Sequence, residues 1–502
     1  MSRAKSRFQR CLAITIFAMS IALRTSVAFS QVQPVPNVVL IYADDMGYGD
    51  LGVQNPDSKI PTPNLDRLAH EGTRFTDAHS SSGVCTPSRY AMLEGRYHWR
   101  KFHGIVNSFD ESVLDNERST LAELLQTKGY KTACIGKWHL GWNWESIKKQ
   151  GRRPDPKTGY SPDAFDWQKS IPGGPRDHGF DYYFGDDVPN FPPYAWFEND
   201  RLMHYPTVGL ATPENTAEGA WEARPGPSVE GWDFWGVMPK LTERAVQWIE
   251  EQNNQQPFFL YFPLTSPHAP IVPAPEFRGK SNANGYGDFV VQTDDAVGRV
   301  LQALDSKGLT ENTWVIFTSD NGPEHYAYER VRVAGHRSMG PLRGLKRDLF
   351  EGGHRVPMIM RWPNRIPAGR VTDGLISQID FYATMSKALG MEIPSGEAED
   401  SIDQTRLLFG DESARSELVH NTNPNGYALR QGDWVFIQAK TGAVSKEPRW
   451  YQEANGYSEE TNEVSLYNLS EDLSQKNNLA ESNAEQLAKM KERLGEILNK
   501  PR

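Results

Sequence analysis

The chain has 502 residues, a formal charge of −10 at neutral pH and a hydrophobic content of 38%. This length is sufficient for one large domain plus a smaller one, and the composition is that of an ordinary globular protein. The negative charge argues against binding of nucleic acid or of an anionic membrane by the chain as a whole. A local metal ion or basic cluster could still hold a small anion.

The N-terminus has the pattern of a secretory signal peptide. Basic residues within 1–10 precede an apolar stretch, residues 11–23, that is too short to span a bilayer. Small residues follow, and Ala28-Phe29-Ser30 supplies a cleavage site before Gln31. We interpret residues 1–30 as a signal peptide, which predicts an exported chain, periplasmic or secreted, with no membrane association after cleavage. An uncleaved membrane anchor is the alternative.

Four apolar segments indicate strands that are buried on both faces, at residues 38–42, 130–136, 257–264 and 313–319. Helical patterns separate them, at residues 63–71, 121–126, 241–250 and 288–304. This alternation predicts an α/β fold with a large, mostly parallel sheet that is flanked by helices.

Polar side chains follow each of these strands. They are Asp44 and Asp45, Lys137 and His139, His268, and Asp320 and Asn321. Because ligands of open α/β sheets bind at the carboxyl ends of the strands, these four sets predict a single site.

Two further regions differ from this pattern. Residues 142–237 are rich in Pro, Gly and aromatic side chains, and we interpret them as an elaboration over the site, with packed surface loops as the alternative. Residues 401–502 contain two patterns of antiparallel strands and an amphipathic helix at the end, typical of a small α+β subdomain. The catalytic domain would then span residues 31–400.

Cys85 lies at the start of a predicted helix, with Thr86 as its cap and Pro87 at its first position. A helix N-terminus favours an anion, and Arg89 lies on the same face of this helix. From the residues alone, Cys85 could be a thiolate nucleophile, half of a disulfide with Cys134, or a packed thiol. The helix start could also bind a sulfate or phosphate.

The candidate metal ligands carry only oxygen donors. Asp44, Asp45, Asp320 and Asn321 suit Ca²⁺ or Mg²⁺ better than Zn²⁺, which prefers His and Cys.

The segment "CTPSR" at residues 85–89, followed by "LEGR", resembles the signature of the formylglycine-dependent type I sulfatases. Other blocks also resemble that family, in the order of the family, and they are spread over residues 37–365. They are "NVVLIYADDMGYGDLG", "GYKTACIGKWHLG", "TSPHAP", "TSDNGPE" and "GPLRGLKRDLFEGGHRVPMIMRWP". The chain departs from the family at Glu94, where members usually carry threonine. Since the core Cys-x-Pro-x-Arg is intact, modification of Cys85 is still expected.

The resemblance implies an alkaline-phosphatase-like fold and a sulfuric ester hydrolase of the arylsulfatase type. It implies that Asp44, Asp45, Asp320 and Asn321, together with the modified Cys85, hold a Ca²⁺ ion. Cys85, converted to formylglycine by a maturation enzyme, would be the nucleophile in its hydrated form. The remaining catalytic positions would be Arg89, Lys137, His139, His268 and Lys346.

The expected substrate is a sulfated carbohydrate or an aryl sulfate, with the carbohydrate favoured by the aromatic insertion and by the basic run Arg343, Lys346 and Arg347. His325, His336 and Arg337 are candidates for the pocket lining, with structural roles as the alternative. A formylglycine-dependent phosphonate or phosphodiester hydrolase is a competing function. So is a non-catalytic, secreted glycan-binding protein in which Cys85 stays unmodified.

Overall fold

The computed structural model describes residues 35–211, 221–253, 255–423, 426–457 and 463–500. The predicted signal peptide therefore lies outside the described residues. Among these residues, no helix is both long enough and apolar enough to cross a membrane.

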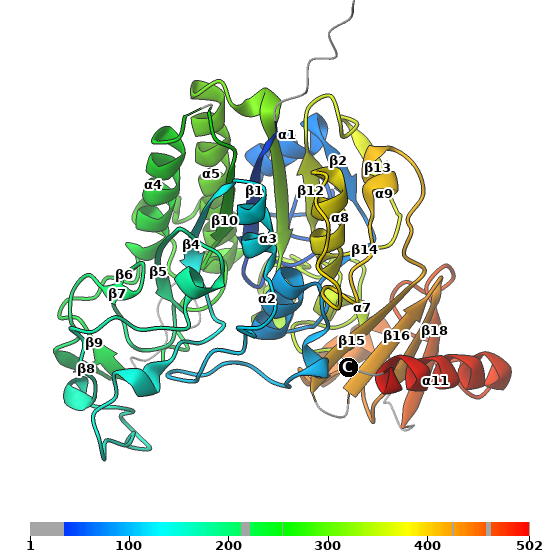
Figure 1. The fold of residues 1–502 in the computed structure, drawn as a ribbon. Coiled ribbons are helices and arrows are strands. Elements are labelled where there is room, and N and C mark those ends of the chain that lie inside the picture. Colours follow the sequence, from blue (N-terminus) through cyan, green and yellow to red (C-terminus); the bar gives the residue numbers. More distant parts are fainter. Residues whose placement is uncertain (1–34, 212–220, 254, 424–425, 458–462, 501–502) are drawn as a thin grey trace, which may run out of the picture. The chain divides into compact units, whose positions relative to one another are not determined.

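A ten-stranded sheet forms the centre of the molecule, in the order β13-β2-β12-β11-β1-β10-β4-β5-β6-β7 (Figure 1). Its strands are β1 (Asn37–Ala43), β2 (Thr73–Phe75), β4 (Lys131–Lys137), β5 (Tyr182–Asp187), β6 (Phe197–Glu198), β7 (Arg201–Leu202), β10 (Phe258–Pro263), β11 (Thr313–Ser319), β12 (Met358–Arg361) and β13 (Arg370–Thr372). The central run from β11 to β5 is parallel, whereas β12, β6 and β7 pair antiparallel. The mostly parallel sheet predicted from the sequence is confirmed.

Helices cover both faces of this sheet (Figure 1). They are α1 (Pro63–Glu71), α2 (Cys85–Glu94), α3 (Leu121–Thr127), α4 (Val237–Glu250), α5 (Asn284–Ser306), α8 (Phe381–Ala388) and α9 (Thr405–Phe409). Two further helices, α6 (Tyr326–Ala334) and α7 (Glu351–His354), lie between β11 and β12 in sequence. Alternate residues of β1 point into two separate cores, because successive side chains of a strand face opposite sides. Val38 and Leu40 pack with α2, α3 and α8, whereas Val39 and Ile41 pack with α1, α4 and α5.

Smaller sheets complete the fold. They are the pairs β3 (Ala78–His79) with β14 (Ile376–Ser377) and β8 (Val208–Leu210) with β9 (Gly226–Ser228), and the antiparallel sheet of β15 (Glu417–Asn423), β16 (Gly426–Gln431), β17 (Trp434–Gln438) and β18 (Val464–Asn468). Helix α10 (Arg449–Asn455) lies between β17 and β18 in sequence, and α11 (Ala484–Asn499) follows β18.

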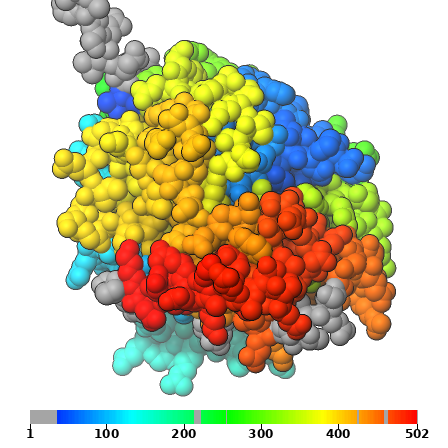
Figure 2. Space-filling model, turned by 90° about the vertical axis from the view of Figure 1, so that its right-hand side faces the viewer, coloured from blue at the N-terminus to red at the C-terminus, as the bar shows by residue number. Residues whose placement is uncertain are grey.

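The C-terminal sheet is packed on both faces. Met490 and Leu494 of α11 cover one face, and Leu349 and Phe350 of the large domain contact the other. Figure 2 shows α11, in red, along the orange strands of this sheet at the surface of the molecule. The predicted α+β subdomain is confirmed as a four-stranded sheet with its helix.

Many aromatic side chains of residues 142–237 belong to the core. Trp142 and Trp144 are buried in the cluster that contains α2 and α3, and Trp142 stacks on Phe197 at a centroid distance of 5.0 Å. Trp221 is buried in the opposite cluster, which also contains residues of α4 and α5. Burial removes these rings from any surface that a sugar could reach, so packing is the main role of the buried aromatics.

Candidate active site

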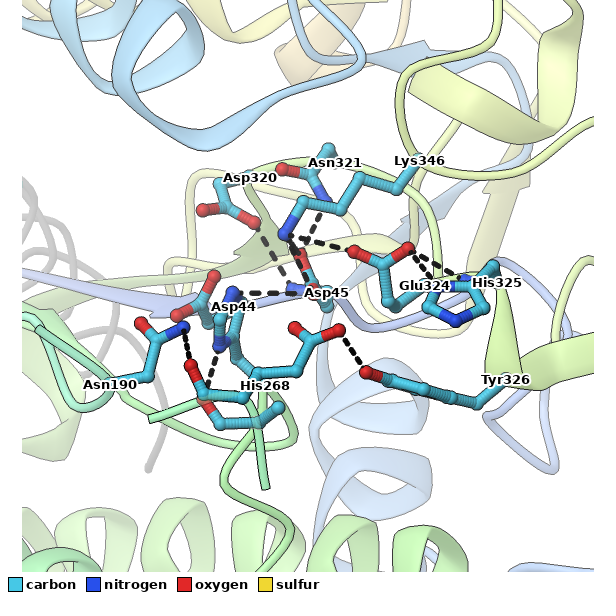
Figure 3. A network of polar contacts seen from close by, with 12 residues as sticks. Asp44, Asp45, Asn190, His268, Asp320, Asn321, Glu324, His325, Tyr326 and Lys346 are labelled. Atoms are coloured by element: carbon cyan, nitrogen blue, oxygen red, sulfur yellow. Dashed lines mark hydrogen bonds and ion pairs between the residues drawn. The ribbon is translucent and has the colours of Figure 1, made fainter. Parts of the chain in front are cut away.

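The four polar strand ends meet at one edge of the sheet. Strands β11, β1, β10 and β4 are neighbours in parallel register, so their carboxyl ends coincide. Lys137 Nζ lies 2.6 Å from Asp44 Oδ2, and Asn321 Nδ2 lies 2.7 Å from Asp45 Oδ1. His268 Nε2 is 3.7 Å from Asp45 Oδ2 (Figure 3). The structure therefore brings the polar residues that follow the four strands together at this edge.

A basic side chain from outside the sheet reaches the same carboxylates. Lys346 Nζ lies 2.8 Å from Asp45 Oδ1 and 3.7 Å from Glu324 Oε2, and its charge interacts favourably with both (Figure 3). Lys346 is almost completely buried, and it enters the site from the loop that precedes α7.

The acidic residues are suited to a hard cation. Asp44 Oδ1 and Asn321 Oδ1 are buried and have no hydrogen-bond partner within the described part of the chain. Burial, and then the charge of Asp44, raise the pKa of Asp320 to about 6. Unpaired oxygen acceptors and crowded carboxylates of this kind fit Ca²⁺ or Mg²⁺.

Cys85 begins helix α2, and Val84 precedes it in the cap position without a side-chain cap. The helix therefore starts two residues before the predicted first position, Pro87. Thr86 has another role: its hydroxyl donates to the carbonyl of His139 at 3.0 Å and accepts from the Val106 N–H at 3.2 Å. It thereby ties the helix start to the loop after β4.

Arg89 and the two lysines surround Cys85 with positive charge. Arg89 Nη2 donates to Asp320 Oδ2 at 2.7 Å, and Arg89 Nη1 donates to the Lys137 carbonyl at 3.2 Å. Burial raises the pKa of the Cys85 thiol, although the charges of Lys137 and Lys346 oppose the rise.

Cys134 lies inside β4, fully buried, and both cysteines of the described chain are free. The disulfide alternative is wrong, and Cys134 is a packed thiol.

His139 and His268 form hydrogen bonds to backbone carbonyls through different ring nitrogens. His139 Nε2 donates to the Val106 carbonyl at 2.9 Å, and its Nδ1 is buried without a partner among the described residues. His268 Nδ1 donates to the Ala269 carbonyl at 2.5 Å, which leaves Nε2 directed toward Asp45. Burial lowers the pKa of His139 far below its usual value, and burial and then Lys346 lower the pKa of His268 to about 4.

Several polar residues near the site were not predicted. Glu324 pairs with Arg347, and Tyr326 bonds to Glu222. Glu324 also accepts from His325 Nδ1 at 2.8 Å (Figure 3). The position of Glu324, just past the β11 end, was the only available signal. The carboxylate of Asp186, at the end of β5, is buried without a partner among described residues, and burial raises its pKa to about 7.

Three of the suggested substrate-binding residues have structural roles instead. Arg343 is buried and pairs with Glu447 at 2.9 Å. His336 is buried and bonds to Asp50 at 2.7 Å, and Arg337 bonds to Asn455. Their basic character therefore serves the fold, while Lys346 and Arg347 from the same region remain close to the site.

Glu94 is buried at the end of α2, where Arg118 Nε lies 3.4 Å from its Oε2. Burial, together with the charge of Asp115, raises its pKa to about 7 from 4.5. The folded protein thus holds this proton more tightly than the unfolded chain does, and the free energy of unfolding falls as the pH rises from about 4.5 to about 7.

Glu94→Gln is expected to reduce this fall by about 2 kcal/mol, because glutamine cannot ionise. Urea denaturation of both proteins at pH 5 and pH 7.5 measures the difference. Glu492→Gln, at an exposed position in α11, is the control and should leave the pH dependence unchanged. An identical pH dependence in the wild type and Glu94→Gln would contradict the assignment.

Comparisons with known proteins agree with this geometry. The profile of a family described as Sulfatase matches residues 36–391. The chain is 32% identical to an N-acetylgalactosamine-6-O-sulfatase of Bacteroides thetaiotaomicron, over 92% of this chain and 93% of that protein. It is 33% identical to arylsulfatase G of Mus musculus, over 81% of this chain and 74% of that protein.

The fold has a counterpart among solved structures. A 6S-sulfatase structure from work on glycosaminoglycan metabolism by Bacteroides thetaiotaomicron superimposes with a TM-score of 0.76 at 30% identity, over 92% of this chain and 99% of that chain.

Proposed function

The chain belongs to the sulfatase family, and from this premise we propose that it removes sulfate from a sulfated carbohydrate, with Cys85 as a formylglycine and a bound Ca²⁺. The observation that carries the proposal is the gathering of Cys85, Arg89, Lys137 and Lys346 around the carboxylates at one sheet edge. At this edge Asp44 Oδ1 and Asn321 Oδ1 have no hydrogen-bond partner among the described residues. Such a site combines a position for a nucleophile with charges that neutralise a sulfuryl group.

Burial of Cys85 favours the modified residue over the thiol. A thiol with a raised pKa is protonated at neutral pH, and a protonated thiol is a weak nucleophile. A hydrated formylglycine at this position would instead supply one hydroxyl to attack sulfur and a second hydroxyl whose deprotonation would expel sulfate and restore the aldehyde.

Asp44, Asp45, Asp320 and Asn321 would hold the Ca²⁺ ion, with the modified Cys85 as a further ligand. When bound, the ion would supply positive charge that neutralises the sulfuryl oxygens. Two buried oxygens of these residues, Asp44 Oδ1 and Asn321 Oδ1, have no hydrogen-bond partner among the described residues, and this supports the assignment.

Arg89, Lys137 and Lys346 supply the fixed positive charges. Each is buried, and each already contacts an acidic residue of the site. Being held in place before the substrate binds, they need little reorganisation as charge develops on the departing oxygen.

His139 and His268 would move the protons. The unpartnered Nδ1 of His139 carries a lone pair, because its Nε2 holds the proton that bonds to Val106. This nitrogen can accept the proton that the second hydroxyl of the hydrate releases. Nε2 of His268 would give a proton to the leaving alcohol once the negative substrate raises its lowered pKa.

His268→Ala is expected to lower kcat by about 10²–10⁴-fold for an alkyl sulfate, and far less for a sulfate ester of an acidic phenol. The phenolate leaves without a proton, whereas the alkoxide does not. Rates for a series of aryl and alkyl sulfates with different leaving-group pKa values measure this dependence. An equal loss for all leaving groups would contradict the role of His268 as the acid.

The relatives point to the substrate class. One of them is named for 6-O-sulfated N-acetylgalactosamine, and the mouse relative N-acetylgalactosamine-6-sulfatase is 34% identical over 73% of this chain. We therefore expect a sulfated amino sugar of a glycan as the substrate. A maturation enzyme that oxidises Cys85 and export through the N-terminal signal complete the proposal.

Desulfation of defined sulfated mono- and oligosaccharides tests the proposed function. We expect the wild-type protein to release sulfate from 6-O-sulfated N-acetylgalactosamine. The Cys85→Ala variant should release none from the same sugar. A strong preference for phosphonates or phosphodiesters would instead favour the competing hydrolase. An unmodified thiol in the Cys85 peptide of natively produced protein, found by mass spectrometry, would favour a non-catalytic glycan-binding protein.

A further inference from the structure

Three histidines meet in a buried cluster outside the active site. His79 ends β3, His354 ends α7 and His420 lies in β15, and each is at most 1% exposed. The ring centroid of His79 lies 5.3 Å from that of His354 and 5.3 Å from that of His420. The cluster thus joins three segments that are far apart in the sequence, at the place where α7 and β15 lie close together (Figure 1).

The outer nitrogens of two of these rings are already bonded to acceptors. His79 Nε2 lies 2.8 Å from Asp77 Oδ1, and His354 Nε2 lies 3.3 Å from the Leu349 carbonyl. A carboxylate and a carbonyl can only accept, so both Nε2 atoms carry the proton. In the neutral rings, the lone pairs are therefore on Nδ1.

These two lone pairs face each other. His79 Nδ1 and His354 Nδ1 are 3.1 Å apart, a distance at which two lone pairs repel unless a cation lies between them. A shared proton would satisfy this pair but leave the third ring unsatisfied. Neither nitrogen of His420 has a hydrogen-bond partner in the described parts of the chain, although the ring is buried. A cation with several ligand positions satisfies all three.

We propose that His79, His354 and His420 bind one divalent transition-metal ion of the zinc class. Two nitrogens at about 2.0–2.1 Å from a tetrahedral ion lie about 3.3 Å apart, close to the separation found for the first two. His420 stacks on His354 with a centroid distance of 3.4 Å, so its ring must turn to direct a nitrogen at the ion. No hydrogen bond from a described residue opposes that rotation.

The surroundings have the outer partners of a metal site. A carboxylate that accepts from a ligating histidine fixes the tautomer and the ring orientation, which is the role of Asp77. Asp77 is held in turn by Arg355 at 3.3 Å and by Arg430 at 3.2 Å. Glu351, which pairs with the same two arginines, lies 3.9 Å from His79 Nε2.

The ion would be structural. Its ligands come from the edge of the large domain and from the C-terminal sheet, and all are shielded from solvent. Metal binding would therefore link the C-terminal subdomain to the catalytic domain, and it would stabilise the folded chain by the free energy of binding. It is separate from the Ca²⁺ chemistry of the active site, which uses oxygen ligands.

Metal analysis of the purified full-length protein tests the proposal. The protein is equilibrated with Zn²⁺ and excess Ca²⁺, passed through a desalting column and analysed by plasma mass spectrometry. About one zinc per chain is expected for the wild type, and a value near zero for His420→Ala and His79→Ala. His178→Ala, which removes another buried histidine, should keep its zinc.

Two further measurements separate this site from the catalytic one. Asp45→Asn and Cys85→Ala should retain zinc, because their side chains belong to the active site. Replacement of zinc by Co²⁺ should give the visible absorption of a tetrahedral cobalt–imidazole site in the wild type and not in His420→Ala. Zinc chelation should lower the melting temperature of the wild type and leave that of His420→Ala unchanged.

A wild-type protein that retains no transition metal, while its sulfatase activity is normal, would overturn the metal site and leave the proposed function intact. The cluster would then hold a shared proton or a buried water. Zinc that persists in His79→Ala and His420→Ala would also overturn it. A protein that binds zinc at this site but has no sulfatase activity would instead contradict only the proposed function.

Discussion

Cys85→Ala is expected to lower kcat/KM for a sulfate ester by at least about 10³-fold, because the substitution removes the proposed nucleophile. The substrate should still bind, since Arg89, Lys137 and Lys346 remain. Steady-state assays with an aryl sulfate and with the preferred sugar sulfate measure the loss. Binding of the sugar sulfate to the inactive variant by calorimetry shows that the site is intact.

Cys85→Ser tests the role of the second hydroxyl of the proposed formylglycine hydrate. A serine hydroxyl can be sulfated, but it has no second hydroxyl to expel the sulfate. We expect at most a single turnover and a protein whose mass increases by one SO₃ group. Cys134→Ala, which removes the packed thiol of β4, is the matched control and should keep activity within about threefold of the wild type. Full activity in Cys85→Ala would contradict the nucleophile assignment.

Asp45→Asn should have the second largest effect, with kcat/KM falling by about 10²–10⁴-fold. Asp45 contacts Lys346 and Asn321 and lies beside His268, so the substitution removes a negative charge where the metal is expected. The Ca²⁺ affinity should weaken accordingly, and calcium titration followed by calorimetry measures it. Treatment of the wild type with a calcium chelator should mimic the variant, and added Ca²⁺ should restore activity.

Asp294→Asn is the control for this experiment. Asp294 is also a buried carboxylate, but it accepts from the backbone of Asn64 and Leu65 at the start of α1. It should change stability without changing the response of activity to Ca²⁺. A calcium-independent wild type would contradict the metal assignment.

The sequence predicted the site well where polar residues directly follow a strand. Strands of apolar residues that end in Asp44, His268 or Asp320 predicted a common edge, because parallel strands place their carboxyl ends together. The start of α2 was displaced because Thr86 bonds to His139 rather than to its own helix. Such a long-range partner is invisible to a local capping pattern.

Other features depend on contacts between distant residues. The histidine cluster joins positions 79, 354 and 420, and no spacing pattern connects them. The basic run that contains Arg343 suggests a substrate contact, but Arg343 is buried against Glu447. The aromatic insertion was ambiguous for a similar reason, since composition does not distinguish a ring packed like Trp142 from a ring exposed to a sugar.

The burial of Cys85 has a consequence for the biogenesis of the chain. Its side chain is 3% exposed once α2 has packed, so an enzyme that oxidises it cannot reach the sulfur in the finished fold. On the proposed function, conversion of Cys85 to formylglycine would therefore have to precede folding, while this segment is still extended. A chain that folds first would be trapped as an inert thiol, and only unfolding would give it a second opportunity to mature.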